Sequence, residues 1–262
     1  MNSEFQEKGF VYKKALFAPE EVGDIRGILT VFHKQWMQEN QSFFLDGAIN
    51  SSGITARRYL DQRSRLLLFN FISSQKLMSL IEEIIPLKPC FMNTQLFFNP
   101  YNAEQKNYWH RDPQYHLSIK EQKEAIKGPT VLHIRIALKD EPGLELIPGT
   151  HKRWDSKEEL DVRLEKGNRR CFEDLPGATK VSLDACDVLL FSGNMIHRGL
   201  YGLDRLALDI LVCDPAEHFV MFAEESCLPN NEEALKIDAP ALFNNTVSLR
   251  KSGRAQTNVD DD

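Results

Sequence analysis

Residues 187–211 read DVLLFSGNMIHRGLYGLDRLALDIL, and they hold the pattern that decides the fold. An apolar run at 187–192 ends in a turn with Gly193, and an alternating run begins at Arg205. In the second run Arg205 and Asp209 fall on one face of an extended chain, while leucine, isoleucine and valine fall on the other. The two runs predict strands at 187–192 and 205–213, the second with a partly polar face.

Similar short runs precede this pair. Apolar or alternating segments lie at 91–99, 107–112, 131–139, 144–147 and 179–183, separated by Pro and Gly. Because helices do not alternate with these strands, the pattern favours an antiparallel sandwich over a parallel βαβ fold. We therefore expect a mostly β fold with flanking helices and a double-stranded β-helix (jelly-roll) core. The charged segment 155–176 is interpreted as a loop or a helical insert.

The N-terminal third has a different period. After a short strand within 9–17, apolar residues recur at helical spacing, at Val22, Ile25, Leu29, Phe32 and Trp36. Residues 40–65 are polar and predict an irregular segment, and a second helix follows at about 74–85. We expect one jelly-roll domain over 1–250, with the polar residues 251–262 as a disordered tail.

Composition excludes several classes of function. The 262 residues contain 32 Lys and Arg against 38 Asp and Glu, a net charge of −6, so the chain lacks the basic field typical of nucleic-acid or anionic-membrane binding. The five cysteines are scattered, without zinc-site spacing, which fits reduced thiols. With no signal-peptide pattern and no long apolar run, we expect a cytoplasmic protein whose partner is a small molecule, and neither nucleic acid nor membrane; the oligomeric state is left open.

A candidate metal site lies in the segment YWHRDPQYH, residues 108–116. If 107–112 is a strand, His110 and Asp112 point to the same face and can bind one ion. His197, after the turn at Gly193, is the best candidate for a third ligand. Two histidines and one carboxylate form the facial triad of non-haem Fe(II) oxygenases. The plainer alternatives are a strand histidine paired with an acid and a loop histidine paired with the backbone.

Arg205 would point into the barrel. Its planar guanidinium suits bidentate binding of a carboxylate, because an uncompensated buried cation is costly. A structural ion pair with Asp204 or Asp209 is the alternative.

Six segments in the same order resemble the phytanoyl-CoA dioxygenase-like family of Fe(II)/2-oxoglutarate-dependent dioxygenases. They are GFVYKKALFAPEEVGDIRGIL (9–29), NTQLFFNPYN (93–102), YWHRDPQYH (108–116), ELIPGTHK (145–152), KVSLDACDVLLFSGNMIHRG (180–199) and RLALDIL (205–211). The HxD motif alone is common, but its combination with the PGTH turn, the distal histidine and the arginine is fairly specific.

The resemblance implies a set of roles. Fe(II) would be bound by His110, Asp112 and His197, and Arg205 would bind the distal carboxylate of 2-oxoglutarate. Such enzymes use O2 and 2-oxoglutarate to hydroxylate a substrate, releasing succinate and CO2, and a retained Asp112 favours hydroxylation over halogenation. Gln95 and Asn99, on the polar face of 91–99, would hydrogen-bond 2-oxoglutarate or substrate.

Departures from the family pattern concern the substrate. The step from His197 to Arg205 is short, the segment KDEPGLEL (139–146) is trimmed, and Arg135 replaces a residue that is commonly Trp. Four polar residues are expected to face inward and to favour a small polar or anionic metabolite: Arg135, His133, Asn93 and Asp209. Two rivals remain: a non-catalytic jelly-roll module that binds a metal or ligand, and a cupin-like metalloenzyme that does not use 2-oxoglutarate.

Overall fold

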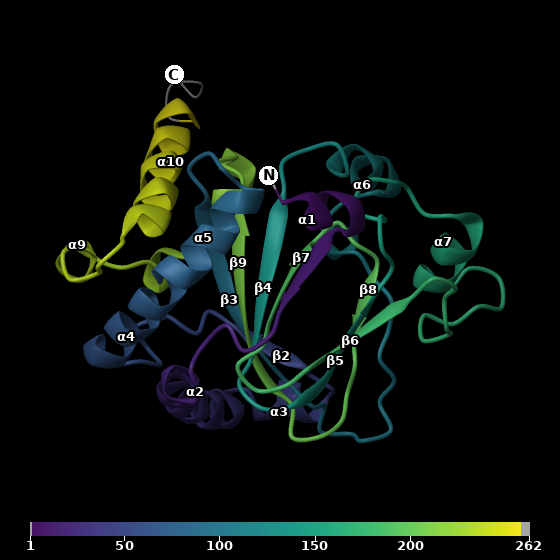
Figure 1. Cartoon of the computed structure of the whole chain (residues 1–262), viewed down its shortest axis with the longest axis horizontal. Helices are drawn as coiled ribbons and strands as arrows, with labels where there is room; N and C mark the ends of the chain where they lie inside the picture. The colour runs from purple at the N-terminus through teal and green to yellow at the C-terminus, as the bar shows by residue number, and fades with distance from the viewer. Residues whose placement is uncertain (1, 258–262) are drawn as a thin grey trace.

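The computed structural model describes residues 2–257 and contains two antiparallel sheets with helices around them (Figure 1). The strands are β1 (Phe10–Lys13), β2 (Asn50–Ser52), β3 (Cys90–Phe98), β4 (Val131–Ala137), β5 (Glu141–Leu146), β6 (Thr179–Leu183), β7 (Val188–Ser192), β8 (His197–Gly199) and β9 (Leu206–Cys213). The large sheet has the order β1-β7-β4-β9-β3-β2, and the small sheet has the order β6-β5-β8. The antiparallel β fold with flanking helices is therefore confirmed.

Helices lie mainly before β3 and after β9. They are α1 (Ser3–Lys8), α2 (Pro19–Glu39), α3 (Gln41–Leu45), α4 (Gln62–Ile72), α5 (Gln75–Ile84), α6 (Ile119–Ala125), α7 (Lys157–Arg163), α8 (Glu217–Val220), α9 (Asn231–Ala234) and α10 (Ala241–Thr257), with short 3-10 turns η1 (Asp112–Tyr115) and η2 (Glu225–Cys227). Among the described residues, no helix combines the length and the apolar character that crossing a bilayer requires.

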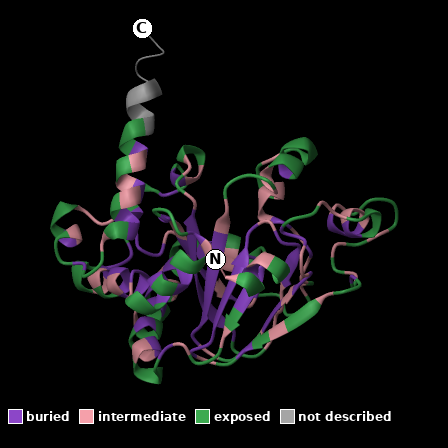
Figure 2. Ribbon diagram, turned by 45° about the horizontal axis from the view of Figure 1, so that its top comes forward, coloured by how far each residue is buried: buried purple, intermediate pink, exposed green. Residues whose placement is uncertain are grey.

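The main core lies between the large sheet and the helices α2, α4, α5 and α10 (Figure 1). The even-numbered residues Leu206, Leu208 and Ile210 of β9 are buried there, in one cluster with Phe69 of α4 and Phe243 of α10. The predicted apolar face of α2 is buried in the same cluster. Figure 2 shows the resulting pattern, with buried central strands and exposed outer helix faces. Because strand side chains alternate, the odd-numbered residues of β9 face the opposite way, towards the small sheet.

Several local predictions are wrong. Residues 107–112 do not form a strand: His110 makes an isolated bridge, and Asp112 begins the 3-10 turn η1. The segment 40–65 is not simply irregular, because it contains α3, β2 and the start of α4. Residues 251–257 continue α10 instead of forming a disordered tail, and 258–262 lie outside the described residues. The helical alternative for 155–176 is correct in part, since α7 lies within it. One domain over 1–250 stays a prediction.

Candidate metal centre

Backbone pairing brings the distant histidines together. The amide of His110 donates to the carbonyl of His197 at 3.0 Å, and the amide of His197 donates back to the carbonyl of His110 at 3.0 Å. Two residues on, the amide of Asp112 donates to the carbonyl of Gly193 at 3.2 Å. The HxD segment is thus fixed along the connection between β7 and β8, and β8 in turn is paired with β5.

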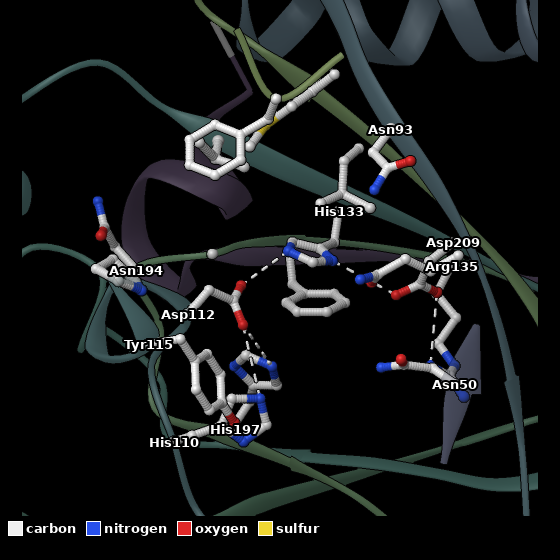
Figure 3. Close-up of a pocket in the computed structure, with 18 of the residues that line it drawn as sticks. Asn50, Asn93, His110, Asp112, Tyr115, His133, Arg135, Asn194, His197 and Asp209 are labelled. Carbon is white, nitrogen blue, oxygen red and sulfur yellow. Dashed lines mark hydrogen bonds and ion pairs between the residues drawn. The ribbon is translucent and has the colours of Figure 1, made fainter. Parts of the chain in front are cut away.

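The three side chains converge on one point (Figure 3). One donor atom each from His110, Asp112 and His197 lies within 4.8 Å of the others. Oδ1 of Asp112 is 3.6 Å from Nε2 of His110 and 3.8 Å from Nε2 of His197. The structure therefore assembles the predicted group of three, although by a loop and a bridge and not by one strand.

Backbone carbonyls orient both rings. Nδ1 of His110 lies 3.2 Å from the carbonyl of Tyr108, and Nδ1 of His197 lies 3.1 Å from the carbonyl of Met195. An Nδ1–H that donates to a carbonyl leaves the lone pair of Nε2 free for an ion. Both Nε2 atoms face Asp112, so the arrangement suits coordination.

The charge states also suit a divalent ion. Burial lowers the pKa of His197 to about 3, an effect that neighbouring His110 increases, and burial lowers the pKa of His110 as well. Burial by itself would raise the pKa of Asp112, but His133, His197 and His110 together bring it below the ordinary value. Two neutral imidazoles and one carboxylate are the donor set that a non-haem Fe(II) site requires.

Another histidine, His133 of β4, is buried and contacts the other carboxylate oxygen of Asp112. Its Nε2 is 2.8 Å from Oδ2 of Asp112, and its Nδ1 is 3.4 Å from Oδ2 of Asp209 on β9. Burial opposes the charged form of this imidazole, but the two carboxylates raise the pKa of His133 to about 10. The predicted inward direction of His133 and Asp209 is therefore correct.

A cavity of about 620 Å³ lies between the two sheets and contains this group. Its polar lining residues include Asn50, Asn93, Gln95, His116, Arg135, Asn194, Arg205, Asp209 and His218. Its apolar lining residues include Met92, Phe97, Leu117, Val131, Phe191, Leu211, Phe219 and Phe222. Such a mixture of apolar surface with a few polar groups is typical of a small-molecule site.

Arg205 is buried beside β8. Its side chain is 1% exposed, and its guanidinium lies over the rings of Phe97 and Tyr201, with the carbon 5.4 Å and 5.5 Å from their centroids. Nη2 has no hydrogen-bond partner among the described residues, and Nε is 3.4 Å from Glu141. Burial and the neighbouring Arg135 lower the pKa of Arg205 to about 10. An anionic ligand would supply the partner that Nη2 lacks.

Arg135 faces the cavity as expected, but it is not a free anion site. Glu141 binds it in bidentate fashion, at 2.7 Å to Nε and 2.9 Å to Nη2, and Asp209 lies 3.5 Å from Nη1. The two acids offered as the alternative partners of Arg205 pair with other cations. Asp204 pairs with Lys139, and Asp209 pairs with Arg135 and His133.

The polar residues predicted on one face of β3 have two different environments. Asn93 and Gln95 line the cavity as expected, and Oδ1 of Asn93 accepts from the amide of Thr94 at 2.8 Å. Asn99 does not line it. Its side chain accepts from the amide of Gly202 at 3.0 Å and donates to the carbonyl of Leu203 at 2.9 Å. Asn99 lies one residue past the end of β3, so its contact with the 202–203 turn replaces the expected ligand contact.

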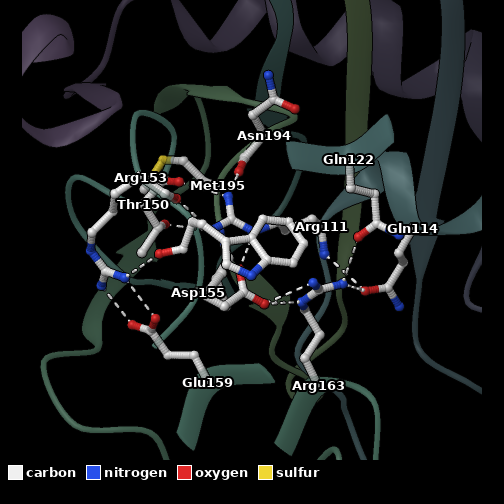
Figure 4. Close-up of polar contacts among 12 residues, drawn as sticks. Arg111, Gln114, Gln122, Thr150, Arg153, Asp155, Glu159, Arg163, Asn194 and Met195 are labelled. Carbon is white, nitrogen blue, oxygen red and sulfur yellow. Dashed lines mark hydrogen bonds and ion pairs between the residues drawn. The ribbon is translucent and has the colours of Figure 1, made fainter. Parts of the chain in front are cut away.

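Sequence reasoning missed the buried ion network behind the metal centre (Figure 4). Nε of Arg111 lies 2.7 Å from Asp155, and Arg163 contacts the other oxygen of Asp155 at 2.7 Å. Arg111 also donates to the carbonyls of Thr150 and Asn194. The available signal was Arg111 inside the HxD motif. On an extended chain it points away from the face that His110 and Asp112 share, and a cation buried on that side needs a carboxylate partner.

The match to a family model settles the family. The model of phytanoyl-CoA dioxygenase (PhyH) matches residues 5–200. The chain belongs to this family. The matched residues include His110, Asp112 and His197, whereas Arg205 and Asp209 lie beyond them. No curated protein matches the chain in sequence.

Solved structures share the fold of this PhyH-family chain at low sequence identity. AviO1 from Streptomyces viridochromogenes Tue57 has a TM-score of 0.56 at 20% identity, over 82% of this chain and 93% of AviO1. HygX from Streptomyces hygroscopicus, with nickel and 2-oxoglutarate bound, has a TM-score of 0.60 at 13% identity, over 82% of this chain and 87% of HygX. The epimerase SnoN, in complex with Fe3+, alpha ketoglutarate and nogalamycin RO, has a TM-score of 0.53 at 14% identity, over 81% of this chain and 82% of SnoN.

These likenesses confirm the predicted family and the jelly-roll core. HygX holds nickel and 2-oxoglutarate, and SnoN holds Fe3+ and alpha ketoglutarate. The cofactors predicted for this chain are Fe(II) and 2-oxoglutarate, with O2 as co-substrate. The individual ligand roles of His110, Asp112, His197 and Arg205 stay predictions.

Proposed function

We propose that this protein is an Fe(II)/2-oxoglutarate-dependent dioxygenase that hydroxylates a small molecule and releases succinate and CO2. One observation carries the proposal: the His110, Asp112 and His197 donors lie in the same cavity as Arg205, whose Nη2 has no protein partner among the described residues. The family match, and the iron or nickel and 2-oxoglutarate bound in the neighbours SnoN and HygX, support it.

Each part of the site has a task under this proposal. The two histidines and Asp112 would hold Fe(II) through three donors and leave positions open for 2-oxoglutarate and O2. Arg205 would bind the distal carboxylate of 2-oxoglutarate in a water-poor pocket formed by Phe97 and Tyr201. The bound metal and oxo acid would supply the activation of O2. The protein would then orient the bound molecules, exclude water and supply the fixed charge of Arg205.

The lining of the cavity bears on the substrate. Among the described lining residues, the basic Lys or Arg side chains are Arg205 and Arg135. The charge of Arg135 is already paired with Glu141 and Asp209. Amide groups such as Asn93 and Asn194 line the same cavity beside aromatic side chains such as Phe222. Of the two substrate classes expected from the sequence, we therefore propose a polar uncharged molecule with some apolar surface in preference to an anion.

Epimerisation is the second candidate. SnoN is an epimerase with iron and alpha ketoglutarate bound, so an enzyme of similar fold produces an outcome other than hydroxylation. Product analysis separates the two, because hydroxylation adds about 16 mass units to the substrate and epimerisation adds none. The cytoplasmic location and the expectation of no nucleic-acid or membrane partner stay predictions.

The test is an anaerobic titration. Fe(II) and 2-oxoglutarate added to the protein should produce the visible charge-transfer band of the chelate, and O2 should then produce succinate. Arg205→Ala should weaken 2-oxoglutarate binding at least about 10-fold, because the guanidinium supplies a charge-assisted bidentate contact. Lys139→Ala, which removes a half-exposed cation paired with Asp204, is the matched control. It should change neither the affinity for 2-oxoglutarate nor the formation of succinate.

Two results would contradict the proposal. Succinate formation that does not need Fe(II) would remove the metal-dependent reaction. A chelate band of equal strength in Arg205→Ala would favour a metalloenzyme that does not use this arginine for an oxo acid. Metal binding with no band and no succinate would favour the non-catalytic jelly-roll module.

A further inference from the structure

Asp112 has histidine partners on opposite sides of its carboxylate (Figure 3). Oδ1 faces Nε2 of His110 and of His197, at 3.6 Å and 3.8 Å. Oδ2 instead lies 2.8 Å from Nε2 of His133, an ion-pair contact that lacks the angles of a hydrogen bond. One oxygen is thus directed to the metal centre, and the other is engaged by a residue outside it.

The sheet fixes His133 more firmly than the loop fixes Asp112. His133 is 5% exposed on β4, a strand paired on both sides, with β7 and β9. Its ring stacks on Phe191 of β7, with centroids 4.7 Å apart and planes inclined by 19°. Asp112 begins a 3-10 turn, and its side chain is 31% exposed. The rigid partner of this contact is therefore the histidine.

Asp209 holds the far side of the ring. Its Oδ2 is 3.4 Å from Nδ1 of His133, across the β4–β9 pairing. Asp209 is 1% exposed and is itself held by Arg135 at 3.5 Å. Both ring nitrogens of His133 therefore face carboxylate oxygens, and the ring is directed by two neighbouring strands.

We infer that His133 is a positioning residue: it binds Oδ2 of Asp112, so that the carboxylate meets the metal through Oδ1 alone, and Asp209 orients the ring for this task. The inference rests on the metal centre of the proposed function. It concerns how the third ligand is held, and it assigns a role in this cavity to two residues that sequence analysis placed with the substrate.

The geometry distinguishes this role from that of a fourth ligand. The mutually close donor group in the described residues consists of His110, Asp112 and His197, and it does not include His133. The Nε2 of His133 points at the carboxylate oxygen that faces away from the other two histidines. Groups that bind a metal-ligating side chain from outside typically change metal affinity about 10- to 100-fold when removed.

Co(II) binding, measured in the absence of 2-oxoglutarate, tests the inference. His133→Met removes the ring nitrogen but keeps a side chain of similar length, and it should weaken Co(II) binding about 10- to 100-fold. His133→Gln keeps an amide N–H within reach of Asp112 and should restore much of that loss. The absorption spectrum of bound Co(II) should also change in the Met variant, because the freed carboxylate can bind through both oxygens. His33→Gln, a half-buried histidine on α2 outside the cavity lining, is the matched control and should bind Co(II) normally.

A second variant covers the case in which His133→Met does not fold. Asp209→Asn keeps His133 and removes the charge behind it, and should weaken Co(II) binding about 3- to 10-fold. Unchanged affinity in a folded Met variant, unchanged affinity in Asp209→Asn, or equal losses in the Gln and Met variants would each overturn the inference. If the unaltered protein does not bind Co(II), the metal centre itself is wrong, and this result is distinct from failure of the positioning role.

Discussion

Gly193 lies directly against the carboxylate of Asp112. A Cβ placed on Gly193 would be 2.9 Å from Oδ2 of Asp112 and 3.6 Å from Nε2 of His133. The carbonyl of the same residue accepts the Asp112 amide. The turn between β7 and β8 therefore needs a residue without a side chain, because the contact between Asp112 and His133 fills that space.

The first prediction follows from this contact. Gly193→Ala should weaken Co(II) binding about 10-fold or more, because the methyl group displaces Oδ2 of Asp112 from His133. A Co(II) titration followed by absorbance measures the loss. Gly23→Ala on α2 is the control: its Cβ would meet no atom of the described residues within 4 Å, so metal binding should not change. Equal affinity in Gly193→Ala and the unaltered protein would contradict the prediction.

The second prediction separates the cosubstrate from the metal. A Cβ on Gly199 of β8 would be 2.8 Å from Nη2 of Arg205. Gly199→Ala should therefore move the guanidinium and weaken 2-oxoglutarate binding about 10-fold, while Co(II) affinity measured without 2-oxoglutarate stays within about 2-fold. Isothermal titration with each ligand measures both quantities, and Gly27→Ala, with open space at its Cβ, is the control. A variant that loses Co(II) instead would show that β8 supports the metal more than Arg205.

Periodicity predicted those parts of the fold that are buried on one side. The helix α2 and the alternation of β9 were predicted because their apolar residues face one continuous core. The segment 107–112 is predicted as a strand for its extended pattern, but among the described residues no strand pairs along it beyond the bridge at His110. A sequence pattern indicates an extended chain. A strand also needs a neighbouring strand to pair with, and that neighbour is set by the tertiary fold.

The same limit applies to the charges. The sequence predicted that Arg135 is buried, but it could not say which acid neutralises it. The partner is Glu141 at the start of β5, six residues along the chain and across a turn. Burial of an arginine can be predicted from alternation, but pairing depends on the path of the turn. For this reason the expected anion site at Arg135 is filled by the protein itself.

The third prediction concerns the ion network at Asp155. This carboxylate lies between Arg111 and Arg163, and all three side chains are at most 1% exposed. Asp155→Asn would leave two buried guanidinium groups without their shared counter-charge, and should lower the free energy of unfolding by about 3–5 kcal/mol. Co(II) binding should weaken too, because Arg111 lies between the proposed ligands His110 and Asp112.

Urea unfolding with a constant m-value measures this loss of stability. Lys157→Ala, on the same helix α7 as Arg163, is the control because its ion pair with Asp161 is exposed on the lysine side. It should cost less than about 1 kcal/mol. If the two variants lose similar amounts of unfolding free energy, the network stabilises the fold no more than a surface ion pair does.

The last prediction concerns acid stability and His151, the buried histidine of the PGTH turn. Burial, with a smaller effect of the Lys152 charge, lowers the pKa of His151 to about 4. In the unfolded chain histidine titrates near pH 6.5. Between these values the unfolded state binds more protons, so stability is fully present above about pH 6.5 and falls as the pH is lowered towards 4. His151→Leu should remove this contribution, so the loss of stability between pH 7 and pH 4 should shrink by up to about 3 kcal/mol.

Urea midpoints measured at a series of pH values test this difference. Ile147→Val, buried in the same turn region, is the matched control. It should lower stability by about 0.5–1.5 kcal/mol at every pH, because it removes a methyl group and no titrating group. If stability falls with pH in the same way in His151→Leu and in the unaltered protein, the pKa of His151 in the folded state is not lowered. The turn would then open to water before the protein unfolds.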